Sequence, residues 1–237
     1  MARDLLAAMA RLASVGIDLV AEVVAPSRCA ACEAPVGAGA LFCAACGVSA
    51  MPAGAASSAD REHAVFDYGG AVAVAIVRFK YAGRSDLAAR FAGVMASAAR
   101  PLRGEVDLVV PVPLHPARLV ERGFDQAAML AGPVARDLGV AHAPRALVRT
   151  RATPPQASLD RASREANVEG AFVCRSPRSV RGRRVLLVDD VRTTGSTLAA
   201  CASALRAACA SEVRALVLAS RDRAGNVHNP ANHEDRA

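Results

Sequence analysis

The residues best suited to chemistry lie in one stretch, residues 185–198, which reads VLLVDDVRTTGSTL. Four apolar residues precede two adjacent carboxylates, Asp189 and Asp190, and a turn rich in hydroxyl groups follows. Free backbone N–H groups at the start of a helix bind phosphate, and Gly195 lets the backbone approach such a ligand closely. The carboxylates can accept hydrogen bonds from vicinal sugar hydroxyls or help to hold Mg²⁺. Together these groups suit a ribose 5-phosphate.

A buried strand and the helix after it must hold these groups in place. Alternating apolar strands and helices predict an α/β doubly wound sheet, which binds ligands at the carboxyl ends of its strands. A capped helix with Asp190 in a solvated turn is the simpler alternative, but capping alone does not explain two adjacent carboxylates. Pro133 is expected to kink or split its helix. Expected strands cover residues 65–68, 106–112, 146–148, 171–174, 184–188 and 214–219, and expected helices cover residues 71–80, 85–100, 123–138 and 197–210.

Four cysteines are spaced as two short pairs, Cys29 with Cys32 and Cys43 with Cys46, in the pattern Cys-x2-Cys-x10-Cys-x2-Cys. Each pair can clamp one side of a tetrahedral ion, and four thiolates leave Zn²⁺ no open position, so we predict a structural zinc site. Disulfides would instead need an oxidising compartment, and a redox-active pair would not need a second pair. The metal would stabilise a segment too small for a core of its own.

Composition excludes several classes of function. The chain has 237 residues and a net charge of +7, and Lys80 is the single lysine among 29 basic residues. A Gly-x4-Gly-Lys phosphate loop is therefore absent, and no apolar run is long enough for a membrane span. With 3% aromatic residues and no tryptophan, a stacking platform for single-stranded nucleic acid is not expected. The arginine excess suits a phosphate-bearing ligand, and the interrupted N-terminal apolar pattern favours a cytoplasmic protein over a secreted one.

Several blocks resemble known families. Residues 185–198 resemble the phosphoribosyl pyrophosphate (PRPP) signature of type I phosphoribosyltransferases. The sequences KYAGR (80–84), PVPL (111–114) and RGFDQ (122–126) are similar to the ComF family, as are Gln156, Arg164, Asn167 and the GAF at 170–172. That family joins a zinc ribbon to a phosphoribosyltransferase domain, and the resemblance covers nearly the whole chain. Asp125 departs from the family pattern, in which asparagine is more usual.

This resemblance implies an α/β protein with the parallel-sheet type I phosphoribosyltransferase fold and a small N-terminal zinc-ribbon module. An apolar stripe at helical spacing predicts an amphipathic helix at the N-terminus, and a stretch rich in Gly, Ala, Ser and Pro predicts a linker. The expected organisation is a helix over residues 1–24, the zinc ribbon over 25–50, a linker over 51–62, the phosphoribosyltransferase-like domain over 63–220 and a polar tail over 221–237.

The resemblance also assigns roles to residues. Asp189 and Asp190 would contact the ribose hydroxyls and serve catalysis, while the 5′-phosphate would bind Thr193, Thr194, Gly195, Ser196 and Thr197. Val112 and Pro113 would belong to the pyrophosphate loop, although a stiff strand exit explains them as well. The long polar stretch 150–168 would form a hood whose Arg161 and Arg164 neutralise the leaving pyrophosphate. Lys80 is a further PRPP-binding candidate, with a surface lysine as the alternative. Arg122 and Gln126, expected at the start of the next helix, can reach the same anion or lie in solvent.

The implied reaction is the transfer of a phosphoribosyl group from PRPP with Mg²⁺ to an unknown acceptor base or nucleotide, with release of pyrophosphate. It needs positioning and charge stabilisation rather than a covalent nucleophile. Thr193 stands where enzymes of 6-oxopurines usually carry an aspartate, which disfavours hypoxanthine or guanine. The alternative is a non-catalytic factor of DNA uptake (natural competence). It would bind single-stranded DNA or a protein, with PRPP or a nucleotide as its regulatory ligand.

Overall fold

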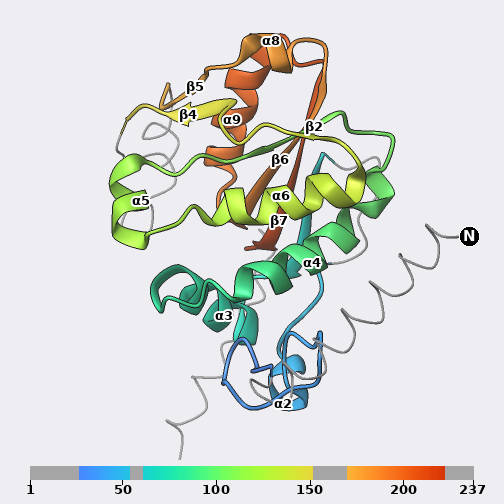
Figure 1. The fold of residues 1–237 in the computed structure, drawn as a ribbon, viewed down its shortest axis with the longest axis vertical. Helices are drawn as coiled ribbons and strands as arrows, with labels where there is room; N and C mark the ends of the chain where they lie inside the picture. Colours follow the sequence, from blue (N-terminus) through green and yellow to red (C-terminus); the bar gives the residue numbers. More distant parts are fainter. Residues whose placement is uncertain (1–26, 54–60, 152–169, 222–237) are drawn as a thin grey trace, which may run out of the picture.

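The computed structural model describes residues 27–53, 61–151 and 170–221 (Figure 1). The expected N-terminal helix over 1–24, most of the linker and the polar tail from residue 222 lie outside these ranges. The stretch that carries Arg161 and Arg164 lies outside them too. Within the described ranges, none of the helices has the length and apolar character needed to cross a membrane.

A five-stranded sheet forms the centre of the fold, with strand order β1-β7-β6-β2-β3 and parallel neighbours throughout. All four residues of β2 are buried, as a parallel strand covered on both faces requires. Pro111 of β2 and Leu216 of β7 both pair with Val188 of β6, so the carboxyl ends of these strands meet at one edge. The strands are β1 (Glu62–Asp67), β2 (Leu108–Pro111), β3 (Ala141–His142), β6 (Arg184–Arg192) and β7 (Glu212–Ser220).

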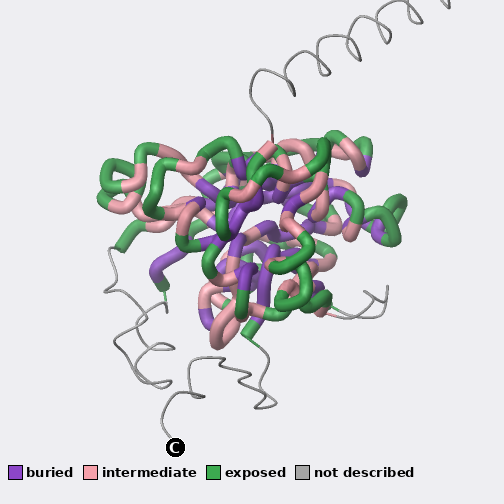
Figure 2. The backbone as a smooth tube through the Cα atoms, turned by 90° about the horizontal axis from the view of Figure 1, so that it is seen from below, coloured by how far each residue is buried: buried purple, intermediate pink, exposed green. Residues whose placement is uncertain are grey.

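Alternate residues of the strands face two separate cores. Val109, Leu186 and Leu216 pack with the helices α3 (Gly70–Tyr81), α4 (Leu87–Ala99) and α6 (Gln126–Leu138). Val110 and Leu187 pack with α9 (Ser196–Ala207) on the opposite face. Figure 2 shows the buried backbone gathered at the centre of the molecule, between these layers. The predicted α/β class is therefore confirmed, because period-two burial on both faces is what a doubly wound sheet needs.

Other elements differ from the expected ones. A helix that the sequence analysis did not predict, α5 (Pro116–Arg122), precedes α6 and ends at Gly123, whose φ is 77°. Arg122 therefore ends one helix instead of starting the next. Asp125 caps α6, since its Oδ1 accepts the Ala128 N–H at 3.0 Å. The remaining short elements are η1 (Arg100–Leu102), α8 (Pro177–Val180) and an antiparallel pair apart from the main sheet, β4 (Leu147–Arg149) with β5 (Phe172–Cys174).

Helix α6 runs through Pro133 without a break, so the expectation of a split helix is wrong. Proline removes one helical hydrogen bond, but seven residues of α6 are buried, and the five from Leu130 onward pack with α4 and the sheet and hold the helix together. They are Gln126, Ala127, Leu130, Ala131, Val134, Ala135 and Leu138.

The N-terminal described segment, residues 27–53, folds around its cysteines and contains one short helix, α2 (Ala44–Gly47). Its small apolar cluster joins Cys29 and Ala31 to Ala71 of α3. Figure 1 shows this segment on one side of α3 and the sheet on the other. Residues 51–53, expected in the linker, instead run beside β1, where the Asp67 N–H donates to the Met51 carbonyl at 2.9 Å.

Candidate functional site

A pocket of about 440 Å³ lies at the carboxyl ends of the central strands. Helix α3 forms one wall through Ile76, Val77, Lys80 and Tyr81. The pocket brings together seven of the residues expected in the site, namely Lys80, Val112, Pro113, Asp189, Asp190, Thr193 and Thr197. A smaller adjoining hollow of about 20 Å³ is lined by Gly195 and Ser196 together with Asp189, Thr193 and Thr197.

The turn between β6 and α9 has the form of an anion site. Gly195 has a φ of 80°, a left-handed conformation that favours glycine, and α9 begins at the next residue. The N-cap residue Gly195 has no side chain to cap this helix, and the Ser196 N–H donates to the Thr194 hydroxyl at a long 3.4 Å. The Thr194 and Ser196 hydroxyl oxygens lie 2.7 Å apart and hydrogen-bond to each other. Thr194 is the one expected turn residue that lines neither hollow.

Lys80 is an interior residue, not the surface lysine of the alternative interpretation. Its Nζ lies 3.0 Å from Oδ1 of Asp190, and the two side chains are 18% and 10% exposed. Burial alone would lower the pKa of Lys80, but the charge of Asp190 and their hydrogen bond outweigh burial and raise it. The pair therefore joins α3 to the tip of β6 as a charged contact.

The surroundings of Asp189, in contrast, disfavour its ionised form. Its Oδ1 accepts the Asp190 N–H at 2.8 Å. Burial, followed by the charge of Asp190, raises the pKa of Asp189 from 3.8 to about 8. A carboxyl group that is costly to ionise is suited to a ligand that supplies hydroxyl donors or a cation.

Asp189→Asn is expected to stabilise the ligand-free protein. Because the pKa of Asp189 is higher in the folded chain, the folded chain holds a proton that the unfolded chain loses. Wild-type stability therefore falls as pH rises from about 4 to about 8 and is level above that. An asparagine side chain does not titrate, and its Oδ1 atom can still accept the hydrogen bond from the Asp190 N–H. The free energy of unfolding should rise by about 1–2 kcal/mol at pH 8.5 and hardly change at pH 4.5, measured by urea titration. An equal effect at both pH values would contradict this assignment.

The opposite wall of the pocket comes from residues 112–126. Asp125 Oδ2 accepts the Leu114 N–H at 3.5 Å, which ties the loop after β2 to the start of α6. Arg122 donates to Gln126 Oε1 at 3.1 Å and to the Tyr81 hydroxyl at 3.0 Å. The Arg122 Nε and Gln126 Nε2 atoms are buried, and neither atom has a hydrogen-bond partner in the part of the chain that is described. These donors at the pocket wall suit a ligand rich in oxygen acceptors.

Sequence reasoning missed several residues that line the pocket. Tyr81 lies under the Arg122 guanidinium at 5.0 Å, and Tyr68 lies under that of Arg221 at 4.7 Å. Both tyrosines of the chain therefore line this pocket, and the KYAGR block at 80–84 had already singled out the segment that contains Tyr81. Arg118 and Arg149 add further positive charge. Arg161 and Arg164, in contrast, lie outside the described residues.

The four expected metal ligands form the second candidate site. The Sγ atoms of Cys29, Cys32, Cys43 and Cys46 all lie within 4.8 Å of one another, and none of these cysteines is in a disulfide. The sulfur atoms of Cys32 and Cys43 lie 3.6 Å apart. Four converging thiols fit a tetrahedral ion such as zinc.

Comparison with known proteins identifies the family of this chain. Residues 125–233 match the model of the phosphoribosyl transferase domain family. The chain is 33% identical to the DNA utilization protein YhgH of Salmonella typhi over 184 residues, 76% of this chain and 78% of that protein. It is 31% identical to Competence protein F of Haemophilus influenzae over 154 residues, 62% of this chain and 67% of that protein. The chain belongs to the ComF family.

The YhgH protein of Escherichia coli K12 is more similar over a shorter stretch, with 35% identity over 146 residues, which is 63% of that protein. Among solved structures, the ComF chain matches the glutamine PRPP amidotransferase of B. subtilis with a TM-score of 0.41 and 23% identity, over 60% of this chain and 30% of that one. Hypoxanthine phosphoribosyltransferase of Trypanosoma cruzi matches with a TM-score of 0.35 and 14% identity, over 57% and 65% of the two chains. The relatives confirm the family expected from the sequence, and the match of residues 125–233 confirms the phosphoribosyltransferase-type fold.

Proposed function

We propose that this ComF protein binds PRPP with Mg²⁺ in the pocket below α3 and transfers its phosphoribosyl group to an acceptor, with release of pyrophosphate. One observation carries the proposal: the paired carboxylates Asp189 and Asp190, near the carboxyl end of β6, and the first residues of α9 line adjoining hollows. Hydroxyl-binding and phosphate-binding groups side by side suit the two ends of a ribose 5-phosphate.

The chain's own residues would work by position and charge. Asp189 and Asp190 would accept hydrogen bonds from the ribose hydroxyls, and residues 193–197 would hold the 5′-phosphate. Val112, Pro113 and Lys80 would lie along the diphosphate, with Arg161 and Arg164 as further catalytic candidates. Mg²⁺ would neutralise part of the diphosphate charge. The bond from C1 to the pyrophosphate oxygen would break while the acceptor nitrogen bonds to C1, and fixed charges near that centre stabilise the change.

Turnover is tested by incubating PRPP and Mg²⁺ with single acceptor bases and nucleotides and measuring pyrophosphate release. The wild type should release pyrophosphate with at least one acceptor, and Asp190→Asn should lower the rate at least 100-fold because ribose positioning is lost. Cys209→Ser, at an exposed cysteine outside the metal cluster, is the control. Equal release by the wild type and Asp190→Asn would contradict catalysis in this pocket.

The names of the relatives, a DNA utilization protein and a competence protein, favour a second role, in the handling of DNA during natural competence. In that role PRPP or a nucleotide would be a regulatory ligand, and DNA or an uptake protein would bind elsewhere. Affinity for single-stranded DNA that falls with salt and survives the Asp189→Ala/Asp190→Ala change would support it. Loss of that affinity in the double variant would contradict a separate DNA surface.

The remaining assignments complete the proposal. Residues 25–50 would form a zinc ribbon and residues 63–220 the transferase domain, between the helix over 1–24 and the tail over 221–237. Residues 51–62 would be the linker between them, with its first three residues beside β1 and its last, Glu62, at the start of that strand. Four thiolate ligands require a reducing compartment, which favours the cytoplasm. Zinc content by elemental analysis should be one ion per chain.

A further inference from the structure

Helix α3 lies between the pocket and the segment that carries the four cysteines. One side lines the pocket through Ile76, Val77 and Lys80. The other side contacts residues 27–53, which we call the cysteine module. At the start of the helix, the Ala71 N–H donates to Ser49 Oγ at 3.1 Å, and Ala71 packs on Cys29. The approach is so close that a Cβ on Gly70 would lie 2.7 Å from Ser49.

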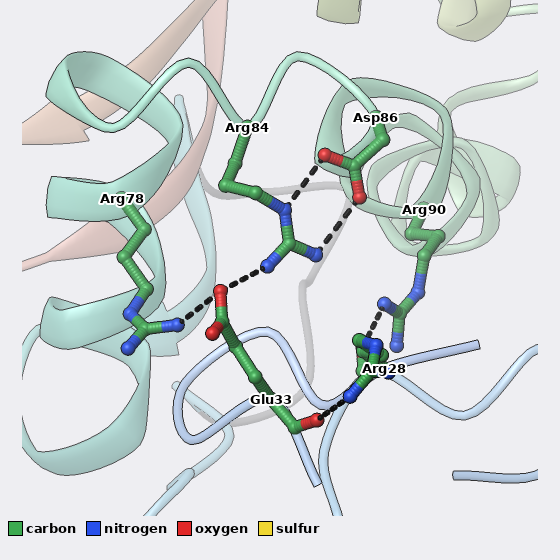
Figure 3. Close-up of polar contacts among 6 residues, drawn as sticks. All are labelled: Arg28, Glu33, Arg78, Arg84, Asp86 and Arg90. Carbon is green, nitrogen blue, oxygen red and sulfur yellow. Dashed lines mark hydrogen bonds and ion pairs between the residues drawn. The ribbon is translucent and has the colours of Figure 1, made fainter. Parts of the chain in front are cut away.

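The far end of α3 is held by one carboxylate of the module, that of Glu33 (Figure 3). Glu33 Oε1 lies 2.8 Å from Arg78 Nη1, near the end of α3, and 2.9 Å from Arg84 Nη1, in the turn after it. Arg84 also forms two hydrogen bonds with Asp86, at 2.8 and 2.9 Å. From α4, Arg90 donates to the carbonyls of Arg28 and Ala40 on the module.

The backbone conformation at Glu33 is fixed by the turn that carries Cys29 and Cys32. Glu33 directly follows the metal-ligand candidate Cys32 and has a φ of 65°, which glycine or asparagine adopts more easily. Its N–H donates to the Cys29 carbonyl at 3.1 Å, and its carbonyl accepts from Arg28 at 3.2 Å. The turn that closes one cysteine pair therefore also fixes where the Glu33 carboxylate points.

We propose that the cysteine module positions α3 over the pocket, with Glu33 as the positioning residue, so that metal loading and ligand binding favour each other. Metal fixes the turn at Cys29 and Cys32, the turn fixes Glu33, and Glu33 holds the end of α3 that carries Lys80. Coupling between two sites is reciprocal, so a ligand under α3 must also retain the metal. The inference takes its ligand from the proposed function but stands on the contacts of α3.

The test compares zinc-loaded wild type with Glu33→Gln, which keeps all four cysteines. Asp137→Asn is the matched control, because Asp137 also pairs with two arginines, Arg100 and Arg103, and lies on α6 away from the module. Calorimetric titration with PRPP and Mg²⁺ should show at least threefold weaker binding by Glu33→Gln and unchanged binding by Asp137→Asn. Saturating PRPP should slow zinc loss to a chelator at least threefold in the wild type, with a smaller effect in Glu33→Gln. Equal affinity of the wild type and Glu33→Gln would overturn the inference.

A second measurement does not depend on PRPP. Hydrogen exchange of the amides of residues 70–81 should speed up in Glu33→Gln and in the zinc-free wild type, while α9 and β6 keep their protection. If the wild type fails to bind PRPP, the proposed function fails, and this exchange alone decides the inference. Unchanged exchange over α3 in both samples would then overturn it.

Discussion

Replacing Cys32 and Cys43 by serine is expected to unfold the cysteine module while the sheet stays folded. The module has almost no core of its own, since Cys29 and Ala31 cluster with Ala71 from α3 and its other buried apolar residues, Ala30 and Leu41, pack into the main core. Structural zinc supplies about 10–16 kcal/mol of apparent binding free energy to small domains of this kind, so its loss exceeds what the few remaining contacts can offset. Hydrogen exchange should show loss of amide protection over residues 27–50, with zinc content falling from one ion per chain to none.

Cys209→Ser is the control for this change, because Cys209 is exposed and lies outside the cluster. It should keep both the zinc and the protection of the module. Protection of residues 27–50 that survives the double serine change would show that contacts with α3 and α4 alone hold the module, and would contradict a metal-dependent fold.

Lys80→Met is expected to lower the free energy of unfolding by about 3 kcal/mol at pH 8. The change leaves the buried Asp190 carboxylate without the ammonium that lies 3.0 Å away. Thermal and urea unfolding at pH 8 measure the effect.

The matched double variant, Lys80→Met with Asp190→Asn, separates charge from packing. Removing both charges leaves neither member of this ion pair without its partner, so the double variant should recover most of the stability lost by Lys80→Met. A double variant as unstable as Lys80→Met would mean that the lysine stem, rather than the ion pair, stabilises α3 at this position.

Local patterns were sufficient for the strand, turn and helix over 184–207 and for the four cysteines, because each is encoded by adjacent residues. Four apolar residues predict a buried strand wherever the strand lies in the sheet. The strand itself runs on to Arg192, beyond the predicted end at residue 188, so both aspartates belong to it. Pairing with β7 extends to Arg192 and Ser220, and nothing within the strand sequence reveals where its neighbour stops.

Long-range contacts were not predictable in the same way. The ion pair of Lys80 with Asp190 and the contacts of Glu33 with Arg78 and Arg84 join elements far apart in sequence. Charged residues at helix ends look alike in sequence whether they face solvent or a partner. The sequence therefore could not decide whether Lys80 lies in the site or at the surface. The short helix α5 was missed because it has no buried residue and therefore no apolar period.

The central claim is that this pocket binds PRPP through the carboxylates at the tip of β6. The most direct test is calorimetric titration of PRPP with Mg²⁺ into the zinc-loaded wild type and into Asp189→Ala/Asp190→Ala. We expect the wild type to bind one PRPP per chain and the double variant to bind at least 100-fold more weakly. Absence of binding by the wild type, or equal binding by both proteins, would contradict the claim.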